Sequence, residues 1–223
     1  PKTAQPSIGR FVEVYDELGK NGNSVISIQM MRSISGTVDA ARQAADITET
    51  NVKVVDSDFT SRSMGMIVKE AAKAAQEGKT VEEILEIIED AKKRTTLYLT
   101  VVNLDNLIKG GRISQLMGMF SNLLNIKLFL QVIHGKIEII QKGRGLKSLQ
   151  KKYDEIFEQM KAAPTGIQEI GIMHAGLSEF NEGNIARVRE LFPDVPLTIV
   201  TTSPIIMSHT GVDAMAITYL ENK

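Results

Sequence analysis

Apolar positions along the first hundred residues alternate between helical spacing and short continuous runs that are typical of buried strands. The first predicted helix follows Ser7, which can cap it, and ends at Gly19. Further helices are predicted at 35–47, 61–77 and around 81–88. Strands are predicted at 24–29, 51–55 and 96–102. Because helices and strands alternate, the chain is predicted to have an α/β fold.

The pattern changes after Gly111, where antiparallel pairing is expected. Apolar runs at 127–133 and 136–141 flank His134-Gly135, a glycine-containing turn that indicates a β-hairpin. The remaining predicted elements are a helix carrying Tyr153, Ile156, Phe157 and Met160, a strand at 169–173, a helix at 181–191 and a strand at 197–201. The predicted organisation is two α/β domains, residues 1–124 and 125–223. No linker rich in Pro, Gly and Ser separates them, so we expect them to pack against each other.

Composition narrows the classes of function. Of the 223 residues, 43% are hydrophobic and 24% are charged, and a net charge of −1 gives no basic footprint for nucleic acid. The chain has no cysteine, which excludes disulfides, thiolate catalysis and thiolate metal sites. No apolar run reaches the roughly twenty residues of a membrane span, and no signal peptide is visible. A cytoplasmic location is the expectation.

The segment 104–114 places two glycines and an arginine at the end of a short apolar helix. Adjacent glycines allow positive φ and a close approach of the backbone to whatever the neighbouring side chain addresses. A guanidinium matches the oxygens of a carboxylate or phosphate, so Arg112 is a candidate for anion recognition. The alternative is an ordinary helix C-cap followed by an exposed base.

Two other turns could contribute hydroxyl donors. The segment 33–37 lies between a strand and a helix, so Ser35 and the first backbone amides, including that of Gly36, can converge on an anion. Ser35 is also the predicted N-cap of that helix, and capping alone can explain a serine there. The segment 3–7 is extended before its helix and leaves Thr3 able to point into a cleft.

The three histidines carry different expectations. His209, flanked by hydroxyls including that of Thr210, is predicted in a loop after the last strand, where a structural role competes with a functional one. His134 is expected to be exposed in the hairpin turn. His174 ends a strand and could face a crevice at the strand ends, although a packed or solvated imidazole is the more ordinary outcome. Their wide spacing does not support a metal site.

Ser35 and His209 with a carboxylate could in principle form a serine hydrolase. The chain lacks a Gly-x-Ser-x-Gly motif, however, and a cap already explains the serine. No phosphate-binding glycine motif follows any predicted strand, so no nucleotide cofactor is indicated.

Five motifs occur in an order that resembles the DegV family of bacterial fatty-acid-binding proteins: 3–7, 33–37, 54–57, 104–113 and 209–211. The resemblance covers nearly the whole chain. It implies two α/β domains that enclose one long-chain fatty acid in a tunnel, with the carboxylate at the domain interface. It also implies a carrier, not an enzyme, that presents the acyl chain to a fatty-acid kinase for phospholipid synthesis.

The resemblance assigns roles to individual residues. Thr3 matches a threonine that binds the head group, and Ser35, next to Gly36, matches a serine that bonds the carboxylate directly. Arg112 and His209, next to Thr210, match the surrounding polar network. Hydroxyls, a cation and an imidazole can together satisfy a buried carboxylate. Candidates for the tunnel lining are Ile34, Met117, Phe120, Leu123, Leu124 and Ile126.

The chain also departs from the family pattern. It starts almost at the threonine motif, so part of the first domain is expected to be missing. Asp213 follows the histidine motif and would oppose a bound anion unless it points away. These departures keep open a divergent relative that acts through protein contacts without lipid. Arg144, after the hairpin, is interpreted as a residue of a solvated turn, with a partner surface as the alternative.

Overall fold

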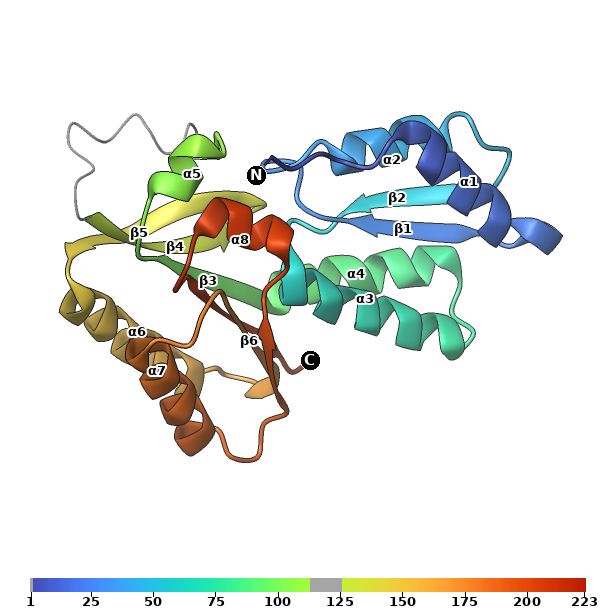
Figure 1. The fold of residues 1–223 in the computed structure, drawn as a ribbon. Coiled ribbons are helices and arrows are strands. Elements are labelled where there is room, and N and C mark those ends of the chain that lie inside the picture. Colours follow the sequence, from blue (N-terminus) through green and yellow to red (C-terminus); the bar gives the residue numbers. More distant parts are fainter. Residues whose placement is uncertain (1, 113–125) are drawn as a thin grey trace. The chain divides into compact units, whose positions relative to one another are not determined.

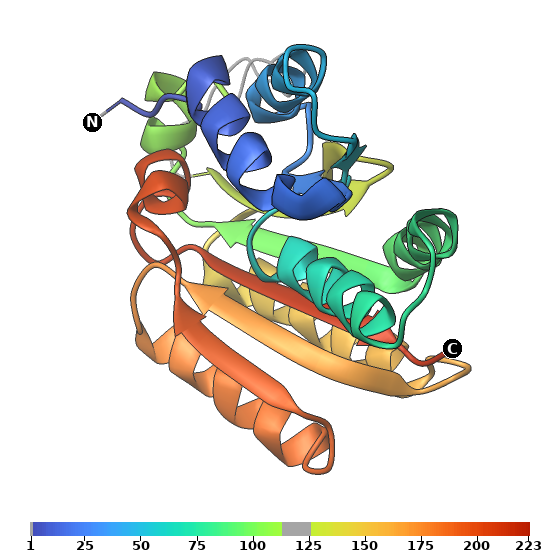
Figure 2. The ribbon, with the colours of Figure 1, turned by 90° about the vertical axis from the view of Figure 1, so that its right-hand side faces the viewer.

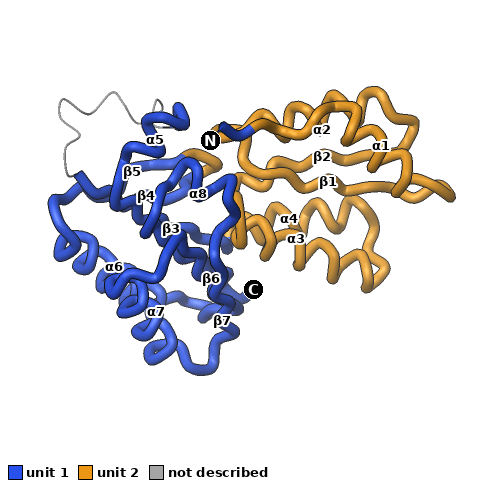
Figure 3. Tube along the Cα trace, in the orientation of Figure 1, with its two compact units in different colours: residues 1–3, 94–133, 137–223 blue, residues 4–93, 134–136 orange. Residues whose placement is uncertain are grey.

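The computed structural model describes residues 2–112 and 126–223. The chain divides into two compact units (Figure 3). Unit 1 comprises Pro1–Thr3, Arg94–Ile133 and Ile137–Lys223, and unit 2 comprises Ala4–Lys93 and His134–Lys136.

Unit 2 is built on two parallel strands, β1 (Val25–Gln29) and β2 (Val52–Asp56). Figure 1 shows α1 (Ile8–Leu18) and α2 (Thr37–Ala45) on one face of this pair and α3 (Ser61–Gln76) and α4 (Val81–Arg94) on the other. A short 3-10 turn, Lys20–Gly22, follows α1. The fully buried side chains of this unit include Val38, Ala41, Met66, Ile67 and Ile88. Helices therefore cover both faces of the strand pair, although Lys53 within β2 is exposed.

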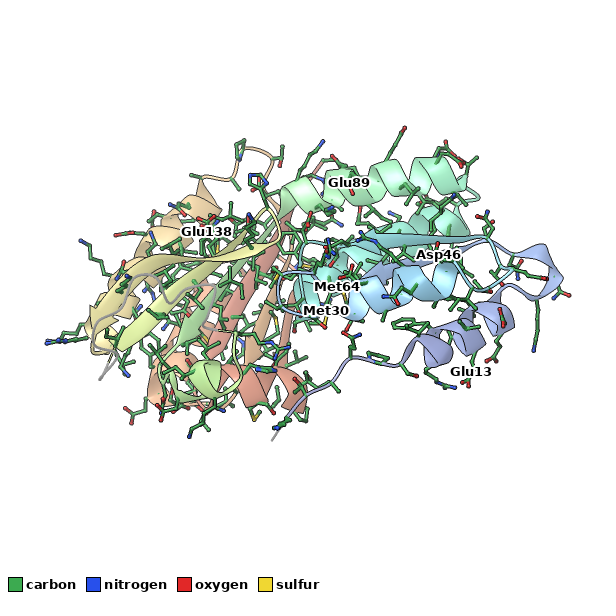
Figure 4. The ribbon with its side chains drawn as sticks, turned by 90° about the horizontal axis from the view of Figure 1, so that it is seen from above. Glu13, Met30, Asp46, Met64, Glu89 and Glu138 are labelled. Carbon is green, nitrogen blue, oxygen red and sulfur yellow. The ribbon has the colours of Figure 1, made fainter. Side chains whose placement is uncertain are left out.

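The helices of unit 2 are amphipathic, as their spacing predicts. Glu13, Asp46 and Glu89 are solvent-exposed (Figure 4). Ser7 caps α1 as predicted, because its Oγ accepts a hydrogen bond from the Arg10 N–H at 3.3 Å.

Unit 1 contains a six-stranded sheet with the order β5-β4-β3-β8-β6-β7. The strands are β3 (Thr95–Val101), β4 (Ile126–Ile133), β5 (Lys136–Arg144), β6 (Ile167–His174), β7 (Leu197–Thr201) and β8 (Met215–Glu221). The β6–β7 pair is parallel, whereas β8 is antiparallel to both β3 and β6. The last strand of the chain thus occupies the middle of the sheet.

The two faces of this sheet carry separate apolar clusters. Helices α6 (Leu146–Lys161) and α7 (Glu179–Leu191) cover one face (Figure 2), where Phe129, Tyr153 and Ile217 are buried. Leu104 and Leu107, the N-cap of α5 (Asp105–Lys109) and a residue inside it, form a second cluster with Val101, Leu128 and Leu130. Because side chains alternate along a strand, Val101 points away from the face of Thr100, whose Oγ1 lies 3.0 Å from the Tyr153 hydroxyl.

The predicted hairpin is confirmed: β4 and β5 are neighbours joined by His134-Gly135. Both turn residues have positive φ, 48° and 69°, which matches the twist of a two-residue hairpin. His134 is exposed, as expected.

The division into units differs from the predicted division at 124/125. Strand β3 pairs with β4 and β8, so residues from Arg94 onward belong to the sheet of unit 1. Pairing between β3 and β8 joins segments more than a hundred residues apart, which composition and local patterning do not reveal.

Two elements were absent from the sequence prediction. Strand β8 was missed although Met215–Leu220 form an apolar, β-branched and aromatic run. Helix α8 (Pro204–Thr210) was assigned to a loop. None of the helices within residues 2–112 and 126–223 has the length and apolarity needed to cross a membrane.

Candidate functional site

Helix α8 carries His209 near its C-terminus, so the predicted loop position of this histidine is wrong. Ser203 caps the helix by accepting a hydrogen bond from the Ile206 N–H at 3.3 Å, and Pro204 occupies the first turn. Gly211 follows the helix with φ of 78°. Serine before proline and glycine after the last residue are ordinary helix boundaries, so the signal for this helix was present in the sequence.

The imidazole of His209 joins two motifs that are 206 residues apart. Its Nε2 lies 2.8 Å from Oγ1 of Thr3, and both residues belong to unit 1. Its Nδ1 is buried and has no hydrogen-bond partner. The predicted association of Thr3 and His209 in one polar network is therefore present within unit 1.

The ring of His209 lies against the backbone of Gly110. A Cβ placed on Gly110 would stand 2.3 Å from Nδ1, which is far inside van der Waals contact. Gly110 has a helical φ of −80°, so its backbone does not require glycine. Gly110 is therefore needed for space, whereas Gly111, with φ of 71°, is needed for conformation.

His209 is held in its neutral form. Burial lowers the pKa of the imidazole, and the positive charge of Arg112 lowers that pKa further. A neutral imidazole carries one N–H, and a buried N–H without an acceptor is less tolerable than an unpartnered lone pair. We therefore assign the proton to Nε2, which donates to Thr3. The hydroxyl proton of Thr3 then remains available to an external acceptor.

Arg112 follows α5 through Gly110 and Gly111, as the motif predicts. One guanidinium nitrogen donates to the Gly110 carbonyl at 2.9 Å, so Arg112 also serves the helix C-terminus, as the C-cap alternative proposed. Its electrostatic effect on His209 brings the two predicted site residues into one cluster. A cation beside a neutral imidazole and a hydroxyl donor suits an anionic ligand.

Thr210 is less suited to donate to a ligand. Its Oγ1 donates to the Ile206 carbonyl at 3.1 Å, and the residue is buried within α8. The hydroxyl proton is therefore used inside the helix, which leaves only an acceptor for anything outside it.

Ser35 and Gly36 lie in unit 2, before α2. The prediction that Ser35 is the N-cap is wrong, because Gly36 occupies that position without a side-chain cap. Oγ of Ser35 instead accepts from the Thr37 N–H at 3.3 Å and lies 2.7 Å from the Thr37 hydroxyl. Serine and threonine hydroxyls form such local turns with nearby backbone amides, which compete with capping.

Gly36 brings a residue into this turn that sequence reasoning missed. A Cβ on Gly36 would stand 2.1 Å from the Gln5 side-chain oxygen, so glycine permits this contact within unit 2. Gln5 belongs to the same 3–7 motif as Thr3. The motif thus contributes Thr3 to the cluster of unit 1 and Gln5 to the turn of unit 2.

Two further expectations concern charged or titratable groups. His174 is buried at the end of β6, with Nδ1 unpartnered. The Asp213 carboxylate lies against Gly176, where an added Cβ would be 2.8 Å from Oδ1. No group of three or more potential metal ligands occurs among residues 2–112 and 126–223.

Only part of the predicted tunnel lining can be placed. Ile126 packs against the apolar cluster formed by Val101, Leu104, Leu107, Leu128 and Leu130. Ile34 lies in unit 2 and is partly buried. Met117, Phe120, Leu123 and Leu124 fall outside the described residues.

The hydrolase alternative finds no support in the hydrogen bonds of Ser35 and His209. A serine nucleophile would need its hydroxyl hydrogen-bonded to the imidazole. Here the Ser35 hydroxyl engages Thr37, and Nε2 of His209 engages Thr3.

The fit between Gly110 and His209 gives a first prediction. Gly110→Ala should lower the free energy of unfolding by about 1–3 kcal/mol, because the new methyl displaces the imidazole. In a His209→Ala background the part of this loss caused by the imidazole should disappear, which a double-mutant cycle in urea would measure, whereas the part caused by the Asn106 carbonyl, 2.9 Å from the added Cβ, should remain. Gly183→Ala is the control, because nothing lies within 4 Å of that helical glycine in α7. Equal losses in both backgrounds would contradict the contact.

The lowered pKa of His209 gives a second prediction. Between the unfolded pKa of about 6.5 and the lower folded value, the unfolded chain binds a proton that the folded protein does not bind. The stabilising contribution is therefore complete above about pH 6.5 and is lost as the pH falls through that window. Urea unfolding from about pH 8 to 5 should show a shallower pH dependence for His209→Gln than for wild type. Parallel curves would disprove the assignment.

Known proteins resemble this chain in sequence. A family profile described as "Uncharacterised protein, DegV family" matches residues 1–222. A DegV domain-containing protein from Streptococcus pneumoniae serotype 4 is 40% identical over 217 residues, which cover 97% of this chain and 77% of that protein. A second one, from Listeria innocua, is 40% identical over 220 residues, which cover 98% of this chain and 78% of that protein.

Solved structures resemble it in fold. DegV from Bacillus subtilis, described as a fatty acid binding protein, has a TM-score of 0.88 and 28% identity, and the match covers 100% of this chain and 79% of that one. A fatty acid binding DegV family protein from Streptococcus agalactiae has a TM-score of 0.88 and 26% identity, with the same coverage. The predicted α/β fold is confirmed, and the predicted lipid-binding role agrees with what these relatives bind. The sequence match over 1–222 and the shared fold establish that this chain belongs to the DegV family.

Proposed function

We propose that this protein binds a long-chain fatty acid and recognises its carboxylate through Thr3, Ser35, Arg112, His209 and the backbone of Gly36. The observation that carries the proposal is the hydrogen bond between Thr3 and the neutral His209 in the presence of Arg112. This arrangement leaves the Thr3 hydroxyl proton available to a ligand and supplies a cation, which are two features that favour an anionic oxygen.

The surroundings of helix α5 support the proposal that the ligand is amphipathic. Leu107, with Leu104 at the N-cap, belongs to the apolar cluster on β3 and β4, and the same helix ends at the motif of Arg112. One five-residue helix therefore lies between a polar cluster and a buried apolar cluster within unit 1. A fatty acid has this polarity, with a charged head and an apolar chain that gains about 0.8 kcal/mol for each buried methylene group.

Ser35 contributes a hydroxyl donor in this proposal. The Thr37 amide and hydroxyl already lie on its oxygen, so the Ser35 hydrogen can turn toward a ligand if the Thr37 hydroxyl donates. The relatives described as fatty-acid-binding proteins bind the same class of ligand as the one proposed here.

A fatty-acid kinase is the partner that the family resemblance adds, and it remains a prediction. It would phosphorylate the carboxylate while the acyl chain stays bound. The competing hypothesis is a relative that acts through protein contacts without lipid, and it predicts a folded protein from which no acyl lipid can be extracted.

Mass spectrometry of an organic extract from protein purified without detergent tests the proposal. We expect one fatty acid per chain. Ser35→Ala and Arg112→Ala should each accelerate palmitate release by about tenfold or more, because each removes a donor to a desolvated carboxylate.

Two matched controls separate binding from folding. Ser7→Ala makes the same chemical change at a helix cap, and Arg144→Ala removes a guanidinium from an exposed position at the end of β5, which the sequence had placed in a turn after the hairpin. Both should release palmitate at the wild-type rate. A folded protein with an empty extract and no affinity for added palmitate would refute the proposal.

A further inference from the structure

Asn106 connects helix α5, which precedes Arg112, to helix α8, which contains His209. It lies in α5, and its side-chain amide donates to the carbonyls of Ser208 at 3.2 Å and Met207 at 3.5 Å. Both carbonyls belong to the last turn of α8, which also contains His209. The contact therefore runs from the helix that precedes Arg112 to the helix that contains His209.

The Ser208 carbonyl, which Asn106 binds, needs a donor from outside α8. The last four carbonyl groups of a helix have no amide partner inside the helix. The Met207 carbonyl also receives the Gly211 N–H at 2.9 Å, which closes the helix. Asn106 serves the Ser208 carbonyl and so caps α8 from a separate segment of the chain.

Asn106 is partly buried and lies near the glycine that ends α8. A Cβ on Gly211, whose φ is 78°, would stand 3.6 Å from Cγ of Asn106, which is ordinary van der Waals contact. The backbone carbonyl of Asn106 receives the Gly110 N–H at 2.8 Å.

We propose that Asn106 is a positioning residue that fixes α8 on α5 and thereby sets the imidazole of His209 between Gly110 and Thr3. This inference rests on the proposed fatty-acid binding and identifies a residue that acts on it without touching the ligand. An amide suits this position because it donates: a carboxylate would repel the two carbonyl oxygens, and an apolar side chain would leave the Ser208 carbonyl without its donor.

The test compares Asn106→Leu with Asn106→Gln and Asn103→Asp. The leucine has similar size and no donor, so it should speed palmitate release about tenfold, whereas glutamine keeps the donors and should restore part of the retention. Asn103→Asp is the matched control, because Asn103 Oδ1 only accepts from the Asp105 N–H at 2.9 Å and a carboxylate accepts as well. It should release palmitate at the wild-type rate.

A second readout uses the lipid-free protein. In Asn106→Leu the Gly211 amide should exchange its hydrogen at least tenfold faster, and NMR should show the pKa of His209 moving back toward its ordinary value. A variant that destabilises the whole unit would instead raise exchange throughout β3 and β8.

The outcomes separate the two claims. If wild type fails to retain palmitate, the proposed function fails. If wild type retains palmitate and Asn106→Leu retains it equally, with an unchanged His209 pKa, the positioning role is overturned while the function stands.

Discussion

The position of the His209 imidazole against Gly110 is the constraint on which the polar cluster of unit 1 depends. The ring occupies the space that any side chain at position 110 would fill, and its Nε2 reaches Thr3 at the other end of the chain. Burial and Arg112 together keep the ring neutral. A protonated ring would need an acceptor at Nδ1, where no partner is present. The geometry thus specifies both the position and the protonation state of this residue.

The sheet of unit 1 fixes the position of the His209 imidazole. Strand β8 follows α8 directly and pairs with β3 and β6 in the middle of the sheet, and α5 follows β3. Helix α5, which precedes Arg112, and helix α8, which contains His209, are therefore connected to adjacent strands. This explains how residues 97 positions apart reach one cluster without a long ordered connection.

Much of the fold could be predicted from local pattern. Short apolar runs located β1, β2, β3, β4 and β7 to within a residue or two, because buried strands leave a continuous signal. Helix α8 was missed because its seven residues end in Ser208, His209 and Thr210, which look like a loop unless Ser203-Pro204 and Gly211 are interpreted as its boundaries. The division at 124/125 differed because strand pairing at long range decides it.

The site residues are a prediction from the family resemblance, and the contacts between them come from the structure. Family resemblance named Thr3, Ser35, Arg112 and His209, but spacing alone could not join Thr3 to His209 across 206 residues. The Gly110-Gly111 pair was expected to allow positive φ, whereas only Gly111 adopts it and Gly110 makes room for a ring. Gln5 and Asn106 lie within the motifs 3–7 and 104–113, but their contacts could not be predicted from the spacing of those motifs.

The central claim is that an ionised carboxylate is bound by hydroxyl donors and a guanidinium. Carbon-13 NMR of palmitate labelled at its carboxyl carbon, bound to the protein and followed from about pH 8 to 5, tests it most directly. The account predicts a single bound resonance that keeps the chemical shift of the carboxylate throughout this range, because nearby donors and positive charge lower the carboxyl pKa. A bound resonance that titrates within the range, or one unaffected by Arg112→Ala, would contradict the account.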